Sequence, residues 1–240
     1  MQEQEMPATS RPLPGPAGFL VAARQLTGWD DESPVGTSAV YYPAVGLLLG
    51  ALMLCFDRLL LGRMTVVFAS LAVLAVQVVL TRGRPLRGLA RSLVRAVYPR
   101  AAASVVVLGI SSAVLFGLGV WLLAAIDQGR SVALLFAPML GRCSMVVIAT
   151  GSREAREDGR QMKFSRELTF REFGIASTVV FAVVFLTTNF LGLLLVLGTG
   201  FLTIALRLLA HWSFGGVDRD SLHAAGEIVQ LAVFGMIALF

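Results

Sequence analysis

The stretch SAVYYPAVGLLLGALMLCFDRLLL, residues 38–61, is apolar almost throughout, and its only charges, Asp57 and Arg58, stand near its end. A bilayer-spanning helix needs about 20 mostly apolar residues, so this stretch predicts a transmembrane helix. Its apolar residues run continuously and do not alternate with polar ones, which argues against a strand of a β-barrel.

Similar apolar runs recur along the chain. Of its 240 residues, 56% are hydrophobic and only 15% are charged, whereas a soluble domain is about 25% charged. We therefore expect an all-α, polytopic helical membrane protein with about six to seven transmembrane helices, embedded in the lipid bilayer. The expected spans are 38–61, 64–80, 101–126, 131–149, the two halves of a hairpin over 174–210 that turns near 187–189, and 224–240.

The domain organisation follows from these spans. Residues 1–37 lack an apolar run and are expected to form a cytoplasmic tail, in which residues 17–27 are compatible with a short amphipathic helix at the membrane surface. Residues 38–240 are expected to form a single transmembrane domain.

The basic residues predict the orientation of the chain. Of the 20 Lys and Arg residues, 12 lie in two segments, 81–100 and 150–173. Positively charged loops stay in the cytoplasm, and seven spans with a cytoplasmic N-terminus place both segments there. This distribution accounts for the net charge of +5, so we expect no nucleic-acid partner. It predicts a multi-pass protein of the cell inner membrane whose motif-bearing loops are cytoplasmic.

The first basic segment carries an arginine face. In LTRGRPLRGLARSLVRA, residues 80–96, Arg87, Arg91 and Arg95 recur every four residues, which places them on one face of a helix. Such a face can anchor the end of a span on anionic headgroups, or it can hold a phosphate group directly. Both interpretations stay open.

A second segment, residues 141–159, combines a charge in an apolar run with a basic stretch. A charge such as Arg142 inside a span is either functional and paired or snorkels to the interface. Arg153, Arg156 and Arg160 follow at helical spacing with Glu157 beside them. Such a face can grip a phosphate, or it is an ordinary solvated helix.

A third segment, residues 214–228, reads FGGVDRDSLHAAGEI, and its residues of interest are Gly215, Gly216, Asp218, Asp220 and Glu227. Paired glycines let a backbone approach a ligand closely. The two aspartates offer the hard oxygen ligands that Mg²⁺ uses with phosphates, and the glutamate lies two helical turns after Asp220 on the same face. The alternative is that Asp220 or Ser221 caps the last helix, with Glu227 at a water boundary. His211 and His223 flank the polar loop 211–223 and are interpreted as solvated loop residues.

Together these segments resemble the cobalamin synthase family, the adenosylcobinamide-GDP ribazoletransferases. YYPAVGLLLGAL at 41–52 resembles the family's first-span signature. AREDG at 155–159, with Arg142 upstream, resembles its arginine followed by ARxEG. GGVDRDSLHAAGEI at 215–228 resembles its GGxTGDxLGAxxE pattern.

The resemblance implies an inner-membrane enzyme that joins adenosylcobinamide-GDP to α-ribazole, giving adenosylcobalamin and GMP with the help of Mg²⁺. Asp220 and Glu227 are then the expected catalytic residues, and Asp218 and Asp220 the expected metal ligands. The residues expected to bind substrate or phosphate are Arg142, Arg156, Glu157, Gly215, Gly216, Arg87 and Arg91. A homo-oligomer is compatible with this interpretation.

The chain departs from the family after the second span, where the family carries LTGxxHLDGLADxxDG with the obvious metal ligands. Here LTRGRPLRGLAR keeps the leucines and glycines in register but has Arg87 and Arg91 at the first two aspartate positions and Val94 at the third. Two unit charges about 4 Å apart interact by roughly 4 kcal/mol at an effective dielectric constant of 20, so these arginines oppose a Mg²⁺ site. Two hypotheses remain: a divergent but active transferase, or a catalytically inactive relative that binds a nucleotide or corrinoid or supports an assembly.

Overall fold

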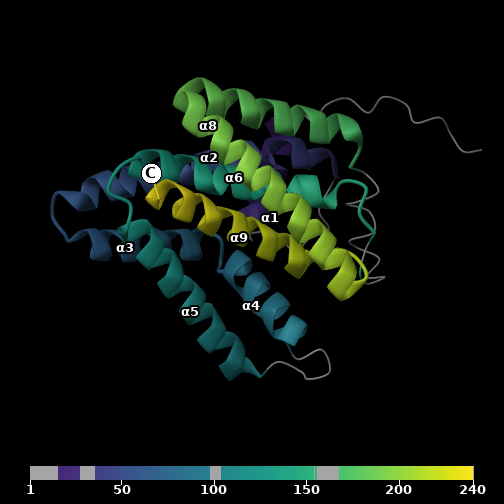
Figure 1. Ribbon diagram of the computed structural model, residues 1–240, viewed down its shortest axis with the longest axis horizontal. Coiled ribbons are helices and arrows are strands. Elements are labelled where there is room, and N and C mark those ends of the chain that lie inside the picture. The colour runs from purple at the N-terminus through teal and green to yellow at the C-terminus, as the bar shows by residue number, and fades with distance from the viewer. Residues whose placement is uncertain (1–15, 28–35, 98–103, 154, 156–167, 240) are drawn as a thin grey trace, which may run out of the picture.

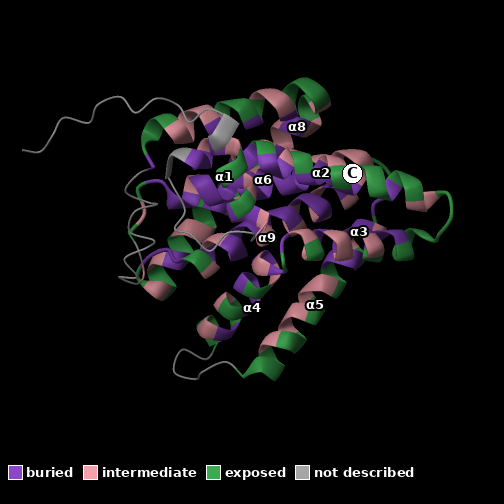
Figure 2. Ribbon diagram, turned by 180° about the vertical axis from the view of Figure 1, so that it is seen from behind, coloured by how far each residue is buried: buried purple, intermediate pink, exposed green. Residues whose placement is uncertain are grey.

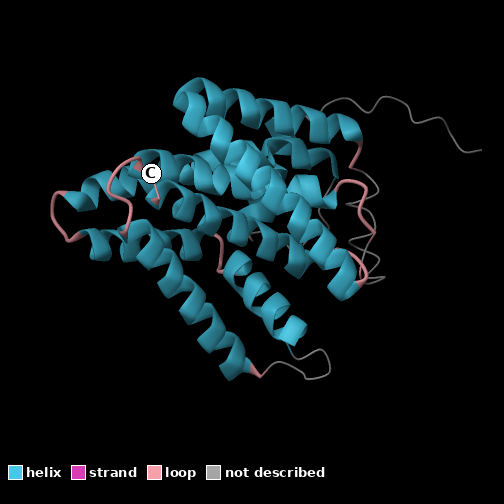
Figure 3. Cartoon of the chain, in the orientation of Figure 1, coloured by secondary structure: helices cyan, strands magenta, loops and turns pink. Residues whose placement is uncertain are grey.

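The computed structural model describes residues 16–27, 36–97, 104–153, 155 and 168–239, and every regular element in these ranges is a helix (Figures 1 and 3). The elements are α1 (Pro16–Thr27), η1 (Gly36–Tyr41), α2 (Tyr42–Leu61), α3 (Val66–Leu80), α4 (Arg84–Val97), α5 (Val105–Ala124), α6 (Arg130–Ala149), α8 (Phe170–Phe214) and α9 (Arg219–Ala238). The expected all-α fold is confirmed.

Five helices are long and apolar enough to cross a membrane, namely Ser38–Leu61, α5, α6, α8 and α9. The pair α3 and α4 makes a sixth span if it is counted as one, although the two helices are bent by 89°. Within α8 the helix is broken at Asn189, where φ is 51° and ψ is −124°, and the chain reverses direction there (Figure 1). The break falls where the sequence predicts the turn of a hairpin.

Residues 84–97 of the first basic segment form the helix α4, as the four-residue spacing of the arginines predicts, and Leu86, Leu89 and Leu93 recur at helical spacing on the opposite side. The expected span 64–80 is only the 15-residue helix α3, which is short for a bilayer on its own.

The helix α6 forms the centre of the molecule, packed between α2 and α9 (Figure 2). At the crossing with α9 the two backbones touch: a Cβ atom on Gly141 would lie 2.5 Å from the carbonyl oxygen of Gly226, and one on Gly226 would lie 3.0 Å from that of Gly141. Only glycine fits such a contact. The next residue on each helix is charged, so the crossing brings Arg142 within electrostatic reach of Glu227.

A buried ion pair ties together the opposite end of the bundle. Asp57 is 1% exposed and lies 2.7 Å from Arg130, Oδ1 to Nη2. Arg130 also donates to the carbonyl oxygen of Leu123 at 2.6 Å and to Ser70 Oγ at 2.9 Å. One guanidinium thus connects α2, α3, α5 and α6.

The helix α1 matches the short helix expected at residues 17–27. Ala22 and Leu26 on one of its faces are buried, and its Gln25 Oε1 accepts hydrogen bonds from Ser38 Oγ at 2.9 Å and from Tyr42 OH at 3.1 Å. The contacts tie α1 to the start of α2.

Candidate functional site

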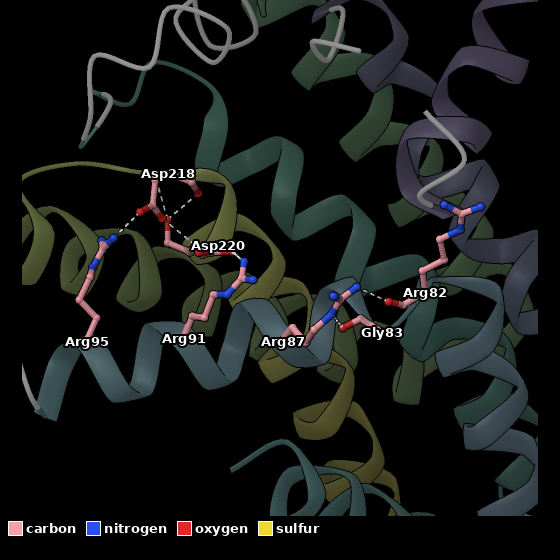
Figure 4. Close-up of polar contacts among 8 residues, drawn as sticks. Arg82, Gly83, Arg87, Arg91, Arg95, Asp218 and Asp220 are labelled. Atoms are coloured by element: carbon pink, nitrogen blue, oxygen red, sulfur yellow. Dashed lines mark hydrogen bonds and ion pairs between the residues drawn. The ribbon is translucent and has the colours of Figure 1, made fainter. Parts of the chain in front are cut away.

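The helix α4 lies against the first turns of α9, and glycine makes the contact close. A Cβ atom on Gly88 would lie 2.7 Å from the Cβ of His223 and 3.0 Å from the carbonyl oxygen of Asp220. The arginine face of α4 therefore runs beside the aspartates that begin α9 (Figure 4).

Two arginines of that face bind these aspartates. Arg91 Nη1 lies 3.3 Å from Asp220 Oδ1, and Arg95 Nη1 lies 2.5 Å from Asp218 Oδ2 (Figure 4). The Arg95 guanidinium also stacks 3.9 Å from the ring centroid of Phe214, which adds a cation–π contact. Arg91 and Arg95 thus form what we call the α4–α9 ion pairs.

Arg87 makes different contacts. Its Nη2 donates to the carbonyl oxygen of Arg82 at 2.5 Å, and its Nε donates to that of Gly83 at 3.4 Å (Figure 4). Arg82 and Gly83 form the bend between α3 and α4 and both have positive φ, 51° and 63°. Arg87 therefore stabilises the bend, and its side chain remains exposed.

Asp218 caps the N-terminus of α9. Its side chain accepts a hydrogen bond from the Ser221 N–H at 2.8 Å, and Ser221 Oγ accepts one from the Asp218 N–H at 2.8 Å. The cap expected at Asp220 or Ser221 is thus formed by Asp218 with Ser221. Burial acts to raise the pKa of Asp218, but the Ser221 N–H and the Arg95 guanidinium outweigh it and hold that pKa below its usual 3.8.

Replacing Asp218 with asparagine keeps a good N-cap and removes the charge bound to Arg95. We expect Asp218→Asn to lower stability at about pH 7 by about 1–2 kcal/mol. A carboxylate with a lowered pKa stabilises the fold above its unfolded pKa and loses that contribution as the pH falls through its folded pKa. The difference from wild type should therefore begin to shrink as the pH falls below 3.8 and vanish once the pH lies below the lowered folded-state pKa of Asp218. Thermal melts in detergent over this range measure it, and a difference that persists in acid would contradict the assignment.

The second and third sequence segments are joined by backbone hydrogen bonds. The Val217 N–H donates to the carbonyl oxygen of Arg153 at 2.8 Å, and the Ala155 N–H donates to that of Val217 at 3.1 Å. The structure therefore brings the beginning of the AREDG stretch to the start of α9. The expected phosphate-binding residues Arg156 and Glu157 lie outside the described residues.

The paired glycines have a visible structural role. Gly215 ends α8 in the left-handed region, with φ 74°, and its N–H donates to the carbonyl oxygen of His211 at 3.1 Å. Gly216 follows and completes the turn into α9. The two glycines thus lead the chain to the start of α9, where Asp218 and Asp220 lie.

Arg142 is the least satisfied charge in the described residues. It is 1% exposed, and its Nε, Nη1 and Nη2 atoms have no hydrogen-bond partner among the residues described. The carboxylate of Glu227 acts on it electrostatically but forms no ion pair with it. Leaving a buried charge without hydrogen bonds is costly, so this guanidinium is suited to an anionic ligand.

His223 was wrongly interpreted as a solvated loop residue. It lies within α9, is 8% exposed, and is acted on by the charges of Arg142, Arg219 and Arg84. One signal in the sequence could have revealed this position. His223 follows Asp220 by three residues and precedes Glu227 by four, which places all three on one helix face. No comparable pattern in the sequence pointed to Arg84 or Arg219.

The described side chains do not fit the Mg²⁺ site that the resemblance implies. Nowhere in the described ranges do three or more His, Cys, Asp or Glu residues come together as a metal site requires. Asp218 and Asp220, the expected ligands, are bound by arginines. Besides these two ion pairs, Arg84, Arg142 and Arg219 lie close enough to act on His223 near the start of α9.

Comparison with known proteins agrees with these motifs. The family model for cobalamin-5-phosphate synthase matches residues 13–91 and 102–238, and the interruption begins directly after Arg91. Similar proteins are the adenosylcobinamide-GDP ribazoletransferases of Pseudomonas fluorescens (strain SBW25), 30% identical over 90% of this chain and 93% of the relative, and of Stutzerimonas stutzeri (strain A1501), 31% identical over 92% and 97%. No solved structure matches. The chain therefore belongs to the cobalamin-5-phosphate synthase family.

Proposed function

We propose that this protein is a membrane transferase that joins adenosylcobinamide-GDP to α-ribazole and releases GMP, giving adenosylcobalamin. Two lines support the proposal: the names and full-length similarity of the relatives, and an orphaned buried guanidinium, Arg142, beside the carboxylate of Glu227. The second observation carries it, because a diphosphate would supply the hydrogen-bond acceptors that Arg142 lacks.

The proposed chemistry is phosphoryl transfer in which the protein positions and neutralises charge. Arg142, with Arg84 and Arg219 nearby, binds the diphosphate. A ribazole hydroxyl oxygen attacks the cobinamide-linked phosphorus, the bond from this phosphorus to the bridging oxygen breaks, and GMP leaves with the electron pair. Glu227 accepts the hydroxyl proton as general base.

Asp220 takes a positioning role in this proposal and not the catalytic one first expected. Its carboxylate is bound to Arg91, which aligns α4 with α9, whereas Glu227 is half-buried and has no ion pair among the described residues. Of the two expected catalytic residues, Glu227 is thus the one suited to exchange a proton.

The proposed location is the cell inner membrane, with the site facing the cytoplasm. Support comes from the 12 basic residues in segments 81–100 and 150–173, since positively charged loops are retained on that side. The site of α4 and the start of α9 adjoins both segments, so nucleotide substrates would enter from the cytoplasm.

Complementation tests the transferase directly. The full chain is expressed in a bacterium lacking its own cobalamin synthase, which is fed cobinamide and the lower-ligand base, and complete corrinoid is measured by its absorbance spectrum after chromatography. We expect wild type to form it and Glu227→Gln to reduce the rate about a hundredfold or more. Asp127→Asn, an exposed acid in the turn before α6, is the matched control and should behave as wild type. Intact membrane-inserted protein with no product would contradict the proposal.

One observation favours a second candidate, a relative that binds a nucleotide or corrinoid without catalysis. The α4–α9 ion pairs occupy both aspartates expected to act as metal ligands. This candidate predicts that purified protein binds adenosylcobinamide-GDP while complementation fails.

A further inference from the structure

We infer that this site binds its diphosphate substrate without a divalent cation, the arginines of α4 and of the bundle interior taking the place of the metal. The inference rests on the proposed function for the identity of the substrate. Arginines neutralise the diphosphate, and arginine–aspartate ion pairs hold α4 and α9 together.

The first step concerns the helix junction. A metal bridging acids on two helices would fix them relative to each other; here the α4–α9 ion pairs do so, at 3.3 Å for Arg91 with Asp220 and 2.5 Å for Arg95 with Asp218. The close contact at Gly88 holds the same junction. The junction is therefore complete without a cation, and its carboxylates are already neutralised.

The second step concerns the interior. Arg142 is buried with all three guanidinium nitrogens lacking partners in the described residues, and Arg84 and Arg219 lie near enough to act on the same neighbour, His223. The described carboxylate that acts on Arg142 is Glu227. A dication entering here would meet positive charge, whereas a diphosphate would meet several charge-assisted donors.

The third step concerns access. The Arg91 side chain is 52% exposed although it touches Asp220, so it keeps donors free on its solvent side. An incoming phosphate can bind Arg91 without breaking the ion pair. The arginine face of α4 therefore both holds α4 against α9 and forms the outer part of the anion site.

The binding experiment uses the full chain in lipid nanodiscs, with adenosylcobinamide-GDP as probe and α-ribazole left out, measured by equilibrium dialysis. We expect the same Kd in EDTA and in Mg²⁺. A Kd that is about tenfold or more weaker in EDTA, which corresponds to about 1.4 kcal/mol, would overturn the inference. Absence of binding in both conditions would overturn it as well.

A charge-reversal variant sharpens the test. Arg87→Asp/Arg91→Asp restores acids beside Asp220, so we expect it to bind Mn²⁺, detected by electron paramagnetic resonance, and to bind the probe only when Mn²⁺ is present. Arg63→Asp, an exposed arginine in the turn after α2, is the control for charge and should behave as wild type. Arg91→Gln keeps the helix without reversing charge and should bind the probe more weakly but still independently of metal. Tight Mn²⁺ binding at the wild-type site would count against the inference.

The binding readout separates this inference from the proposed function. Metal-independent binding with no corrinoid formed in cells would leave the inference standing and remove the transferase. Corrinoid formation together with Mg²⁺-dependent binding would support the transferase and overturn the inference of metal-independent binding.

Discussion

Arg142→Met is expected to make the substrate-free protein more stable while abolishing substrate binding. Methionine has a similar length and no charge, so the variant removes a buried guanidinium that has no hydrogen-bond partner in the described residues. Burying a charge costs several kcal/mol. Removing the Arg142 guanidinium should therefore raise the free energy of unfolding by about 1–3 kcal/mol. Transfer should fall by about a hundredfold or more, as on removal of a charge-stabilising donor.

Thermal melts in detergent, with and without adenosylcobinamide-GDP, measure both effects. Wild type should gain stability from the ligand, because a ligand that binds only the folded state stabilises it, and Arg142→Met should gain none. Arg142→Lys keeps a charge but not the planar donors, so it should bind the ligand only weakly. A variant that melts well below wild type without ligand would mean that Arg142 is structurally paired.

Arg130→Met should have the opposite effect on stability, although it changes the same residue type on the same helix. The Asp57 carboxylate would lose the guanidinium that now binds it at 2.7 Å and would stay buried without compensation. Removing one partner of a buried ion pair costs about 3–5 kcal/mol. We expect a loss of this size, measured by thermal or denaturant unfolding in mild detergent.

The double variant Arg130→Met/Asp57→Leu tests whether the unpaired Asp57 carboxylate causes this loss of stability. It removes both charges, so it should recover most of the loss, as buried ion pairs replaced by apolar residues often do. Arg58→Met is the control, because Arg58 makes an exposed hydrogen bond to Ser131 and should cost less than about 1 kcal/mol. A double variant no more stable than Arg130→Met would assign the cost to the lost contacts with Ser70 and Leu123.

Arg130 and Arg142 show how far the sequence can predict this protein. Apolar runs predicted the helical membrane fold, and the length of the run 174–210 predicted a hairpin that turns near the break at Asn189, because both signals are local. Hydropathy places Arg130 just before a span and Arg142 inside it, but it does not indicate the partner of either arginine. Only the fold shows that one meets an aspartate from α2 and the other meets no partner in the described chain.

The ion pairs of the site were unpredictable for a related reason. Arg91 and Asp220 are 129 residues apart in sequence, and Arg95 and Asp218 are 123 apart. Helical spacing put the arginines on one face, but nothing local indicated that α4 bends by 89° from α3 and lies on α9. The sequence therefore suggested repulsion of a metal, whereas the fold shows mutual neutralisation.

The ion pair between Arg91 and Asp220 also constrains how this lineage can change. Replacing Arg91 alone with an acid would place two carboxylates against each other, and replacing Asp220 alone with a base would place two cations together. Each single step is penalised unless a divalent cation or a compensating substitution arrives with it. The charge reversal thus acts as an epistatic barrier: descendants of this protein would regain an acidic helix by coupled changes rather than one residue at a time.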